Sequence, residues 1–308
     1  MSKSAAKKIV VCGGNGFLGS RICKFAVARG WDVTSISRSG EPKWSAVTAS
    51  STPPSWAHKV SWESADIFQP AAYAPLLKGA DYIVHSMGIL LEADYKGVVS
   101  GRESPIAGLR RAFDPSRGGS SSPNPLERGG DNGSYRPPEN EKQLTYENMN
   151  RDSAVLVARA AEEGMAAATT TSSSTTAATG PAFLYVSAAG GAPVLPRRYI
   201  DTKREAESLL ASGFPRMRGI FLRPPFLYDS SRPFTIPMAA MTGVGAAFNG
   251  LTRGVFGGLM GAAGAKPLRV DVVAQAAVEA LSDEGVRGPV EVPEIEELAG
   301  KAWRKDML

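Results

Sequence analysis

The chain is poor in cysteine and histidine, with two residues of each type among 308. A disulfide framework is therefore excluded as the basis of the fold. Cys12 and Cys23 are expected to be small buried apolar residues in a reducing compartment. No metal site is expected.

The chain also lacks a long hydrophobic run and a concentrated block of charge. No uninterrupted run of about eighteen apolar residues occurs, so no segment must span a bilayer. The 35 Lys and Arg exceed the 30 Asp and Glu, and the net charge is +5, but the basic residues are scattered along the sequence. This distribution does not favour nucleic-acid binding.

A glycine-rich turn follows the first apolar stretch. Residues 8–12 predict a buried strand, and Gly13, Gly16 and Gly19 follow at the spacing GxxGxxG before a helical pattern begins. In such a unit the first glycine permits a tight turn, the second lets the backbone approach a pyrophosphate, and the third lets the helix pack close to the strand. The context predicts a dinucleotide site, and the alternative is a surface turn without a ligand.

Strand and helix patterns alternate through the first two thirds of the sequence. The expected strands are 8–12, 31–36, 60–67, 82–88, 183–188 and 219–224. The expected helices are 20–29, 71–77, one that opens at Tyr146, 199–210 and 271–281. This alternation predicts an α/β fold, a Rossmann-like doubly wound parallel sheet with a small C-terminal lobe on the substrate side.

The expected domain boundary lies near residue 225. Residues 1–225 form the NAD(P)-binding domain and 226–308 a C-terminal substrate or interaction lobe. Two low-complexity insertions, 95–143 and 166–180, are expected to be flexible loops. The nearly uncharged stretch 235–262 is open to three interpretations: small-residue packing, an interfacial membrane patch, or a lid over a ligand.

A polar, Ser- and Pro-rich link over 39–58 follows the second expected strand. On the helix after Tyr146, Arg151, Asp152 and Arg159 are expected to stay in solvent.

The chemistry of the chain centres on a Tyr-x-x-x-Lys pair. Tyr199 and Lys203 are four residues apart in a predicted helix, so both side chains share one face, and Ser187 stands at the end of the preceding strand. A phenol titrates near pH 10, so a nearby ammonium is needed to favour its phenolate near neutral pH. The alternative is structural: a strand-end hydroxyl, a packing ring and a solvated charge.

The end of the second expected strand bears on the choice of cofactor. An acid there would accept hydrogen bonds from an adenosine ribose, but this chain has Ser37, Arg38 and Ser39. A guanidinium between two hydroxyls suits a 2′-phosphate, so NADP(H) is favoured over NAD(H).

Together these motifs resemble the short-chain dehydrogenase/reductase superfamily, in its extended or atypical branch of epimerase-like proteins. The resemblance also uses Asn150 and the strand end Arg223-Pro224. It implies that Tyr199 is the general acid or base on a carbonyl or alcohol, that Ser187 polarises the same oxygen, and that Lys203 holds the nicotinamide ribose. Asp66 and Ile67 would lie over the adenine edge and residues 86–88 under its ribose. The implied cofactor-binding residues are Gly13, Asn15, Gly16, Phe17, Leu18, Gly19, Ser37, Arg38, Asp66, Ile67, Ser86, Met87, Gly88, Tyr199 and Lys203.

Within that branch, residues 37–40, 199–207 and 267–274 are most similar to fungal mitochondrial proteins associated with coenzyme Q biosynthesis. They are also similar to the NADPH-holding accessory subunit of respiratory complex I. The resemblance implies a protein on the matrix side of mitochondria, peripheral to the inner membrane, with a coenzyme Q biosynthetic complex as partner. A hydrophobic, lipid-like substrate such as a prenylated quinone precursor would fit. The alternatives are a non-catalytic accessory protein stabilised by its dinucleotide and, ranked lower, a sugar-nucleotide epimerase or dehydratase.

Overall fold

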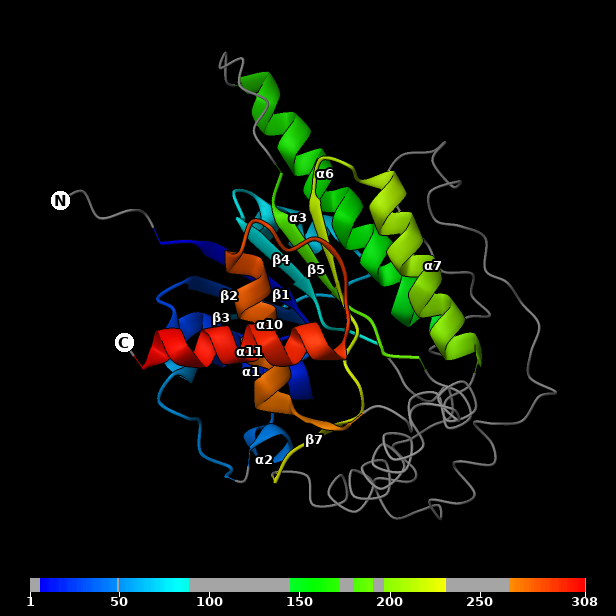
Figure 1. Cartoon of the computed structure of the whole chain (residues 1–308). Coiled ribbons are helices and arrows are strands. Elements are labelled where there is room, and N and C mark those ends of the chain that lie inside the picture. Colours follow the sequence, from blue (N-terminus) through cyan, green and yellow to red (C-terminus); the bar gives the residue numbers. More distant parts are fainter. Residues whose placement is uncertain are drawn as a thin grey trace, which may run out of the picture.

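The described residues of the computed structural model form one parallel sheet with helices on both faces (Figure 1). They are residues 6–48, 50–88, 145–171, 180–190, 197–230 and 266–307. The expected insertion 95–143 and the uncharged stretch 235–262 lie outside them. The seven strands lie in the order β3 (Val60–Ser64), β2 (Asp32–Ser37), β1 (Lys8–Cys12), β4 (Tyr82–His85), β5 (Ala182–Val186), β6 (Arg218–Leu222) and β9 (Gly288–Val290). The predicted Rossmann-like doubly wound fold is confirmed.

The central strand β1 shows why the sheet is covered on both sides. Its β-branched residues favour an extended backbone, and alternate side chains enter opposite cores. Ile9 and Val11 pack in one core, whereas Val10 and Cys12 pack in the other. Strand β1 pairs in parallel with both β2 and β4, and Val10 lies opposite Thr34 of β2 and Ile83 of β4.

Two layers of helices cover the sheet (Figure 1). One layer contains α1 (Phe17–Ala28), α10 (Val270–Ser282) and α11 (Val292–Asp306). The other contains α3 (Pro70–Leu77), α6 (Ser153–Thr171) and α7 (Arg197–Gly213). In the described part of the chain, no helix has the length and apolar character that crossing a membrane requires.

The link after β2 is more ordered than its composition predicts. It contains α2 (Trp44–Val47) and η1 (Ala57–Lys59), and the expected strand 60–67 ends at Ser64. Trp44 packs edge-on against Trp56 and Trp62, with ring centroids 5.5 and 5.8 Å away. Burial of these rings offsets the cost of ordering the link.

The start of the helix after Tyr146 also departs from expectation. Residues Glu147–Asp152 form a π-helical turn, η3, that leads into α6. Arg151 and Asp152 are buried, with 2.8 Å between Nε and Oδ1, because α7 packs against η3. The expected solvent exposure of these two side chains is therefore wrong, whereas Arg159 is half-buried.

Helix α6 continues to Thr171, so the first part of the stretch 166–180 is helical and not a loop. Good helix formers such as Ala166 extend the helix here. Residues 172–179 lie outside the described residues.

The last forty residues return to the sheet. Strand β9 pairs with β6, and α11 begins with a capping box between Glu291 and Glu294. Neither element was predicted, because Gly288 and Pro289 are typical of a turn. A separate pair of short parallel strands, β7 (Leu227–Tyr228) and β8 (Leu268–Arg269), precedes α10. The C-terminal lobe expected from 226 stays a prediction for its central part, which lies outside the described residues.

Candidate dinucleotide and catalytic site

The glycine turn joins β1 to α1 at the carboxyl end of the sheet. Gly13 has a φ of +86°, and its N–H donates to the Ile36 carbonyl at 2.8 Å. A Cβ on Gly19 would lie 2.2 Å from the Gly13 carbonyl oxygen, closer than any side chain tolerates. Gly14 is also tightly packed, because a Cβ there would lie 2.3 Å from Ser35 Oγ and 2.8 Å from Ser35 Cβ. Sequence reasoning missed Gly14, since the spacing template leaves that position open.

The helix end beyond this turn fits an anion. Gly16 is the N-cap of α1, and no side chain from the described residues caps the helix. Phe17 is half-buried and Leu18 buried in the first turn. An uncapped helix N-terminus over a glycine turn offers backbone N–H groups and a favourable dipole to a phosphate. The residues therefore fit the pyrophosphate of a dinucleotide.

The segment after β2 is fixed beside the turn by three hydrogen bonds. The Asn15 amide donates to Ser39 Oγ at 2.8 Å, and the Ser37 hydroxyl donates to the Gly40 carbonyl at 2.8 Å. The Ser64 hydroxyl donates to the Arg38 carbonyl at 2.9 Å. The backbone of Arg38 is thereby held while its side chain remains exposed. The structure thus brings together Asn15 and the predicted 2′-phosphate residues.

The ends of β3 and β4 supply the remaining residues of the cofactor side. Asp66 lies just beyond β3, where its Oδ1 accepts from the Phe68 N–H at 3.0 Å, and Ile67 is buried. The Ser86 hydroxyl donates to the Cys12 carbonyl at 3.0 Å. Met87 approaches the glycine turn, since a Cβ on Gly13 would lie 2.8 Å from Met87 Cγ.

Gly88 lies where the cofactor-binding side of the site meets α7, which carries Tyr199 and Lys203. A Cβ there would lie 2.8 Å from Asn150 Oδ1 and 3.0 Å from Lys203 Nζ. The absence of a side chain therefore lets β4, η3 and α7 meet at one point. Asn150 is fully buried on the π-helical turn, a feature that recurs at functional sites.

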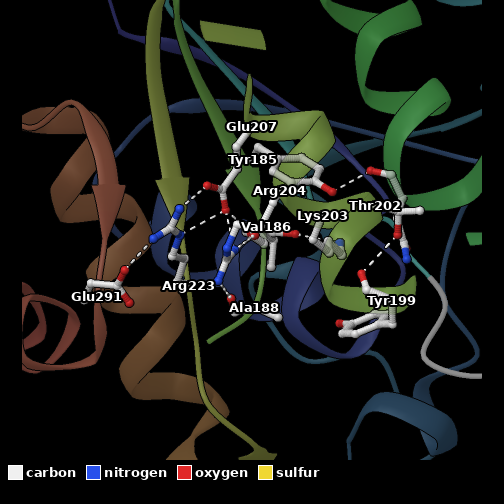
Figure 2. Close-up of polar contacts among 12 residues, drawn as sticks. Tyr185, Val186, Ala188, Tyr199, Thr202, Lys203, Arg204, Glu207, Arg223 and Glu291 are labelled. Atoms are coloured by element: carbon white, nitrogen blue, oxygen red, sulfur yellow. Dashed lines mark hydrogen bonds and ion pairs between the residues drawn. The ribbon is translucent and has the colours of Figure 1, made fainter. Parts of the chain in front are cut away.

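Lys203 is buried on α7 and faces the end of β5. Its ammonium donates to the Val186 carbonyl at 2.8 Å and lies 4.8 Å from the centre of the Tyr185 ring (Figure 2). Burial lowers the pKa of Lys203 to about 7. The dashed line from Lys203 in Figure 2 runs to Val186 and not to Tyr199.

Tyr199 is half-buried one turn earlier on α7. Its ring packs edge-on against Tyr146, with 5.7 Å between centroids. Burial raises the pKa of Tyr199 to about 12, and the positive charge of Arg204 opposes that rise. The cation that acts on the phenol is therefore Arg204, which the sequence analysis did not single out.

Ser187 belongs to a polar network that we call the β5–β6 polar cluster, in which Ser187 and Glu207 are buried (Figure 2). Its members are Ser187, Arg204, Glu207, Arg223 and Glu291. The Ser187 hydroxyl donates to Glu207 Oε1 at 2.5 Å and accepts from Arg204 Nη1 at 2.9 Å. Glu207 also pairs with Arg223, whose Nη1 reaches Glu291 Oε1 at 2.6 Å. The predicted catalytic residues thus lie on the expected elements, but the Ser187 proton is engaged by Glu207.

The missed members of this cluster have a recognisable signal. Glu207 follows Lys203 by four residues, so it lies on the same face of α7. That face is buried, and a buried carboxylate requires cationic partners. Arg204 and Arg223, at the end of β6, are the cationic partners of Glu207 in the structure.

Comparisons with known proteins show the family of the chain. A sequence profile of the NAD dependent epimerase/dehydratase family matches residues 9–94. MIOREX complex component 2 of Saccharomyces cerevisiae is 37% identical over 226 residues, which cover 73% of this chain and 74% of the yeast protein.

Solved structures share the fold at low sequence identity. An oxidoreductase of the short-chain dehydrogenase/reductase family from Burkholderia thailandensis gives a TM-score of 0.52 at 15% identity, covering 93% of this chain and 92% of its own. ElxO, solved with NADP bound, gives a TM-score of 0.53 at 13% identity, covering 92% and 95%. The chain therefore belongs to one family with yeast MIOREX complex component 2, its N-terminal part matches the NAD dependent epimerase/dehydratase family, and its fold is the Rossmann-like fold that short-chain dehydrogenase/reductase structures share.

Proposed function

We propose that this protein binds NADP(H) and transfers a hydride to or from a hydrophobic carbonyl or alcohol. One observation carries the proposal. The glycine turn and the Tyr199-Lys203 helix lie at the carboxyl edge of the same sheet, joined through Gly88, where doubly wound folds bind their ligands. The dinucleotide, when bound, supplies or accepts the hydride.

Two side chains on α7 handle the proton in this proposal. Tyr199 gives its phenolic proton to the substrate oxygen or takes it back. Lys203, with a pKa of about 7, holds or releases a proton near neutral pH beside the Val186 carbonyl. Its position next to Gly88 and Asn150 suits a ribose hydroxyl as ligand.

The preference for NADP(H) is part of the proposal. Arg38 is exposed and stands between Ser37 and Ser39 in the sequence, and the hydrogen bonds of those serines hold this segment in place. A guanidinium forms a stronger pair with a phosphate than with a ribose hydroxyl. These features support a 2′-phosphate as ligand.

The biological setting rests on the resemblance and on the yeast relative. We place the protein in mitochondria, at the matrix side of the inner membrane, in association with coenzyme Q biosynthesis. A prenylated quinone precursor would be the hydrophobic substrate and a coenzyme Q biosynthetic complex the partner. The name of the yeast relative, a component of the MIOREX complex, supports membership in an assembly.

A second candidate is a non-catalytic accessory protein whose dinucleotide stabilises the fold. The observation in its favour is the Ser187 hydroxyl, which donates its proton to Glu207. Ligand binding to the native state alone would then account for the glycine turn.

Substitution of Tyr199 separates the two candidates. Tyr199→Phe removes the acid–base hydroxyl and keeps the ring against Tyr146, so the melting temperature and NADPH affinity should stay unchanged. Loss of ubiquinone synthesis in cells that depend on this variant would support catalysis, and full synthesis would support the accessory role. Tyr228→Phe, on β7, is the matched control and should leave all three measurements unchanged.

A further inference from the structure

The direction of the hydrogen bonds at Ser187 limits what this residue offers to a ligand. A serine hydroxyl has one proton, and Ser187 gives it to Glu207 Oε1. Its oxygen meanwhile accepts from Arg204 Nη1, and the residue is only 3% exposed. Ser187 therefore has no proton left with which to polarise a substrate oxygen.

Arg204 has the donors that Ser187 lacks. A guanidinium carries five N–H groups. Three of them have acceptors within the described part of the chain: Ser187 Oγ, Glu207 Oε1 and the Ala188 carbonyl. The side chain is 31% exposed at the carboxyl end of β5, so its other N–H groups can meet a ligand.

The charge balance around Arg204 favours an anion. Two cationic side chains, Arg204 and Arg223, pair with the buried carboxylate of Glu207. Glu291 lies at the solvent edge of the cluster, with its side chain 50% exposed. Away from that solvent edge, two guanidinium groups share one buried carboxylate, so an anionic oxygen at Arg204 would find free N–H donors on a cation.

We propose that Arg204 binds a substrate oxygen at the carboxyl end of β5, and that this oxygen belongs to a carboxylate on the hydrophobic substrate of the proposed function. Glu207 is then a positioning residue, because it holds Arg204 and draws the Ser187 proton away from the ligand. The inference rests on the proposed function, since the carboxylate would occupy the same sheet edge as the dinucleotide.

Calorimetric titration of the full chain tests this inference in two stages. NADP⁺ is titrated first, and decanoate is then titrated into the NADP⁺ complex, with decanol as the uncharged probe of equal length. We expect decanoate to bind at least about tenfold more tightly than decanol, because a charge-assisted hydrogen bond is lost with the alcohol.

Variants assign the binding to Arg204. Arg204→Gln should weaken decanoate about tenfold or more and leave NADP⁺ affinity unchanged, whereas Arg204→Lys, which keeps the charge but loses the fork, should weaken it about three- to fivefold. Arg197→Gln, an exposed arginine at the start of the same helix, is the matched control and should bind decanoate as the unaltered chain does. Thermal melting confirms that each variant is folded, and Arg204→Lys serves where Arg204→Gln does not fold.

The outcomes separate the inference from the proposed function. Absence of NADP⁺ binding would overturn the proposed function and this inference with it. Binding of NADP⁺ without a preference for decanoate over decanol would overturn the inference alone. So would a Ser187→Ala variant that loses as much decanoate affinity as Arg204→Gln, since Ser187 would then be the donor.

Discussion

The glycine turn and the β5–β6 polar cluster occupy the same edge of the sheet and are built in opposite ways. The turn consists of backbone and glycines, and its geometry follows from the space that a Cβ would need at Gly13, Gly14 and Gly19. The cluster consists of long charged side chains, and its geometry follows from which groups pair when they are buried. The glycine turn has almost no space for an added side-chain atom, whereas the polar cluster depends on each of its charged groups having a partner.

This contrast teaches where each region is vulnerable. Added volume in the turn must displace backbone, since Gly19 faces the Gly13 carbonyl. Loss of the buried Glu207 carboxylate leaves two half-buried guanidinium groups with fewer partners.

Loss of the Glu207 carboxylate should have the largest effect. Glu207→Ala removes the partner of Ser187, Arg204 and Arg223 together, and the free energy of unfolding should fall by about 3–5 kcal/mol. Asp201→Ala, an exposed acid on the same helix, should change it by less than about 0.5 kcal/mol. Urea denaturation of both variants measures the difference, and equal stabilities would show that the cluster contributes nothing specific.

Added volume at Gly19 should come next. Gly19→Ala brings a Cβ against the Gly13 carbonyl, so the turn must shift, at a cost of about 1–3 kcal/mol. NADPH affinity should fall with it. Gly164→Ala on α6 is the matched control, because its nearest neighbour would be Lys78 Cγ at 3.9 Å, and it should stabilise by about 0.5–1 kcal/mol. Unchanged NADPH affinity in Gly19→Ala would show that the glycine turn does not contact the cofactor.

The third prediction concerns pH. Burial lowers the pKa of Lys203 from its ordinary value of 10.5 to about 7 in the folded chain. Between pH 7 and 10.5 the unfolded chain therefore binds more protons at this lysine than the folded chain does. Stability then rises with pH through this window. The free energy of unfolding, compared with that of Lys203→Met, should rise by about 1 kcal/mol per pH unit from pH 7 to 9.

Denaturation series at several pH values measure this slope. Lys59→Met, an exposed lysine on η1, is the control and should follow the unaltered chain at every pH. Parallel profiles for the unaltered chain and Lys203→Met would mean that Lys203 is not desolvated in the folded protein.

The smallest predicted effect tests cofactor choice. Arg38→Ala should weaken NADPH about tenfold and NADH less than about twofold, because only NADPH carries the 2′-phosphate. Fluorescence titration of both cofactors measures this, with the exposed Arg216→Ala as control. An equal loss for both cofactors would assign Arg38 to another part of the site.

The same contrast explains what the sequence could predict. The order of strands and helices and the glycine turn follow from periodicity and spacing, which act over short stretches of chain. The partner of Ser187 does not, since Glu207 is twenty residues away and its burial depends on how α7 meets β5. Likewise, Arg151 and Asp152 are buried only because η3 packs on α7, which no local pattern records.

Strand β9 and the tryptophan-lined link over 39–58 escaped prediction for a related reason. Gly288-Pro289 is typical of a turn, yet the neighbouring β6 supplies a parallel partner that makes it a strand. The link is polar in composition, but Trp44, Trp56 and Trp62 bury one another. In both places a tertiary contact overrides local preference.

The central claim is that a pyridine dinucleotide binds over the glycine turn, and calorimetric titration of the purified full chain with NADPH and NADH tests it most directly. We predict that both cofactors release or absorb measurable heat with one site per chain, and that NADPH binds more tightly. Folded protein that shows no heat with either cofactor would contradict the claim, and with it the proposed oxidoreductase.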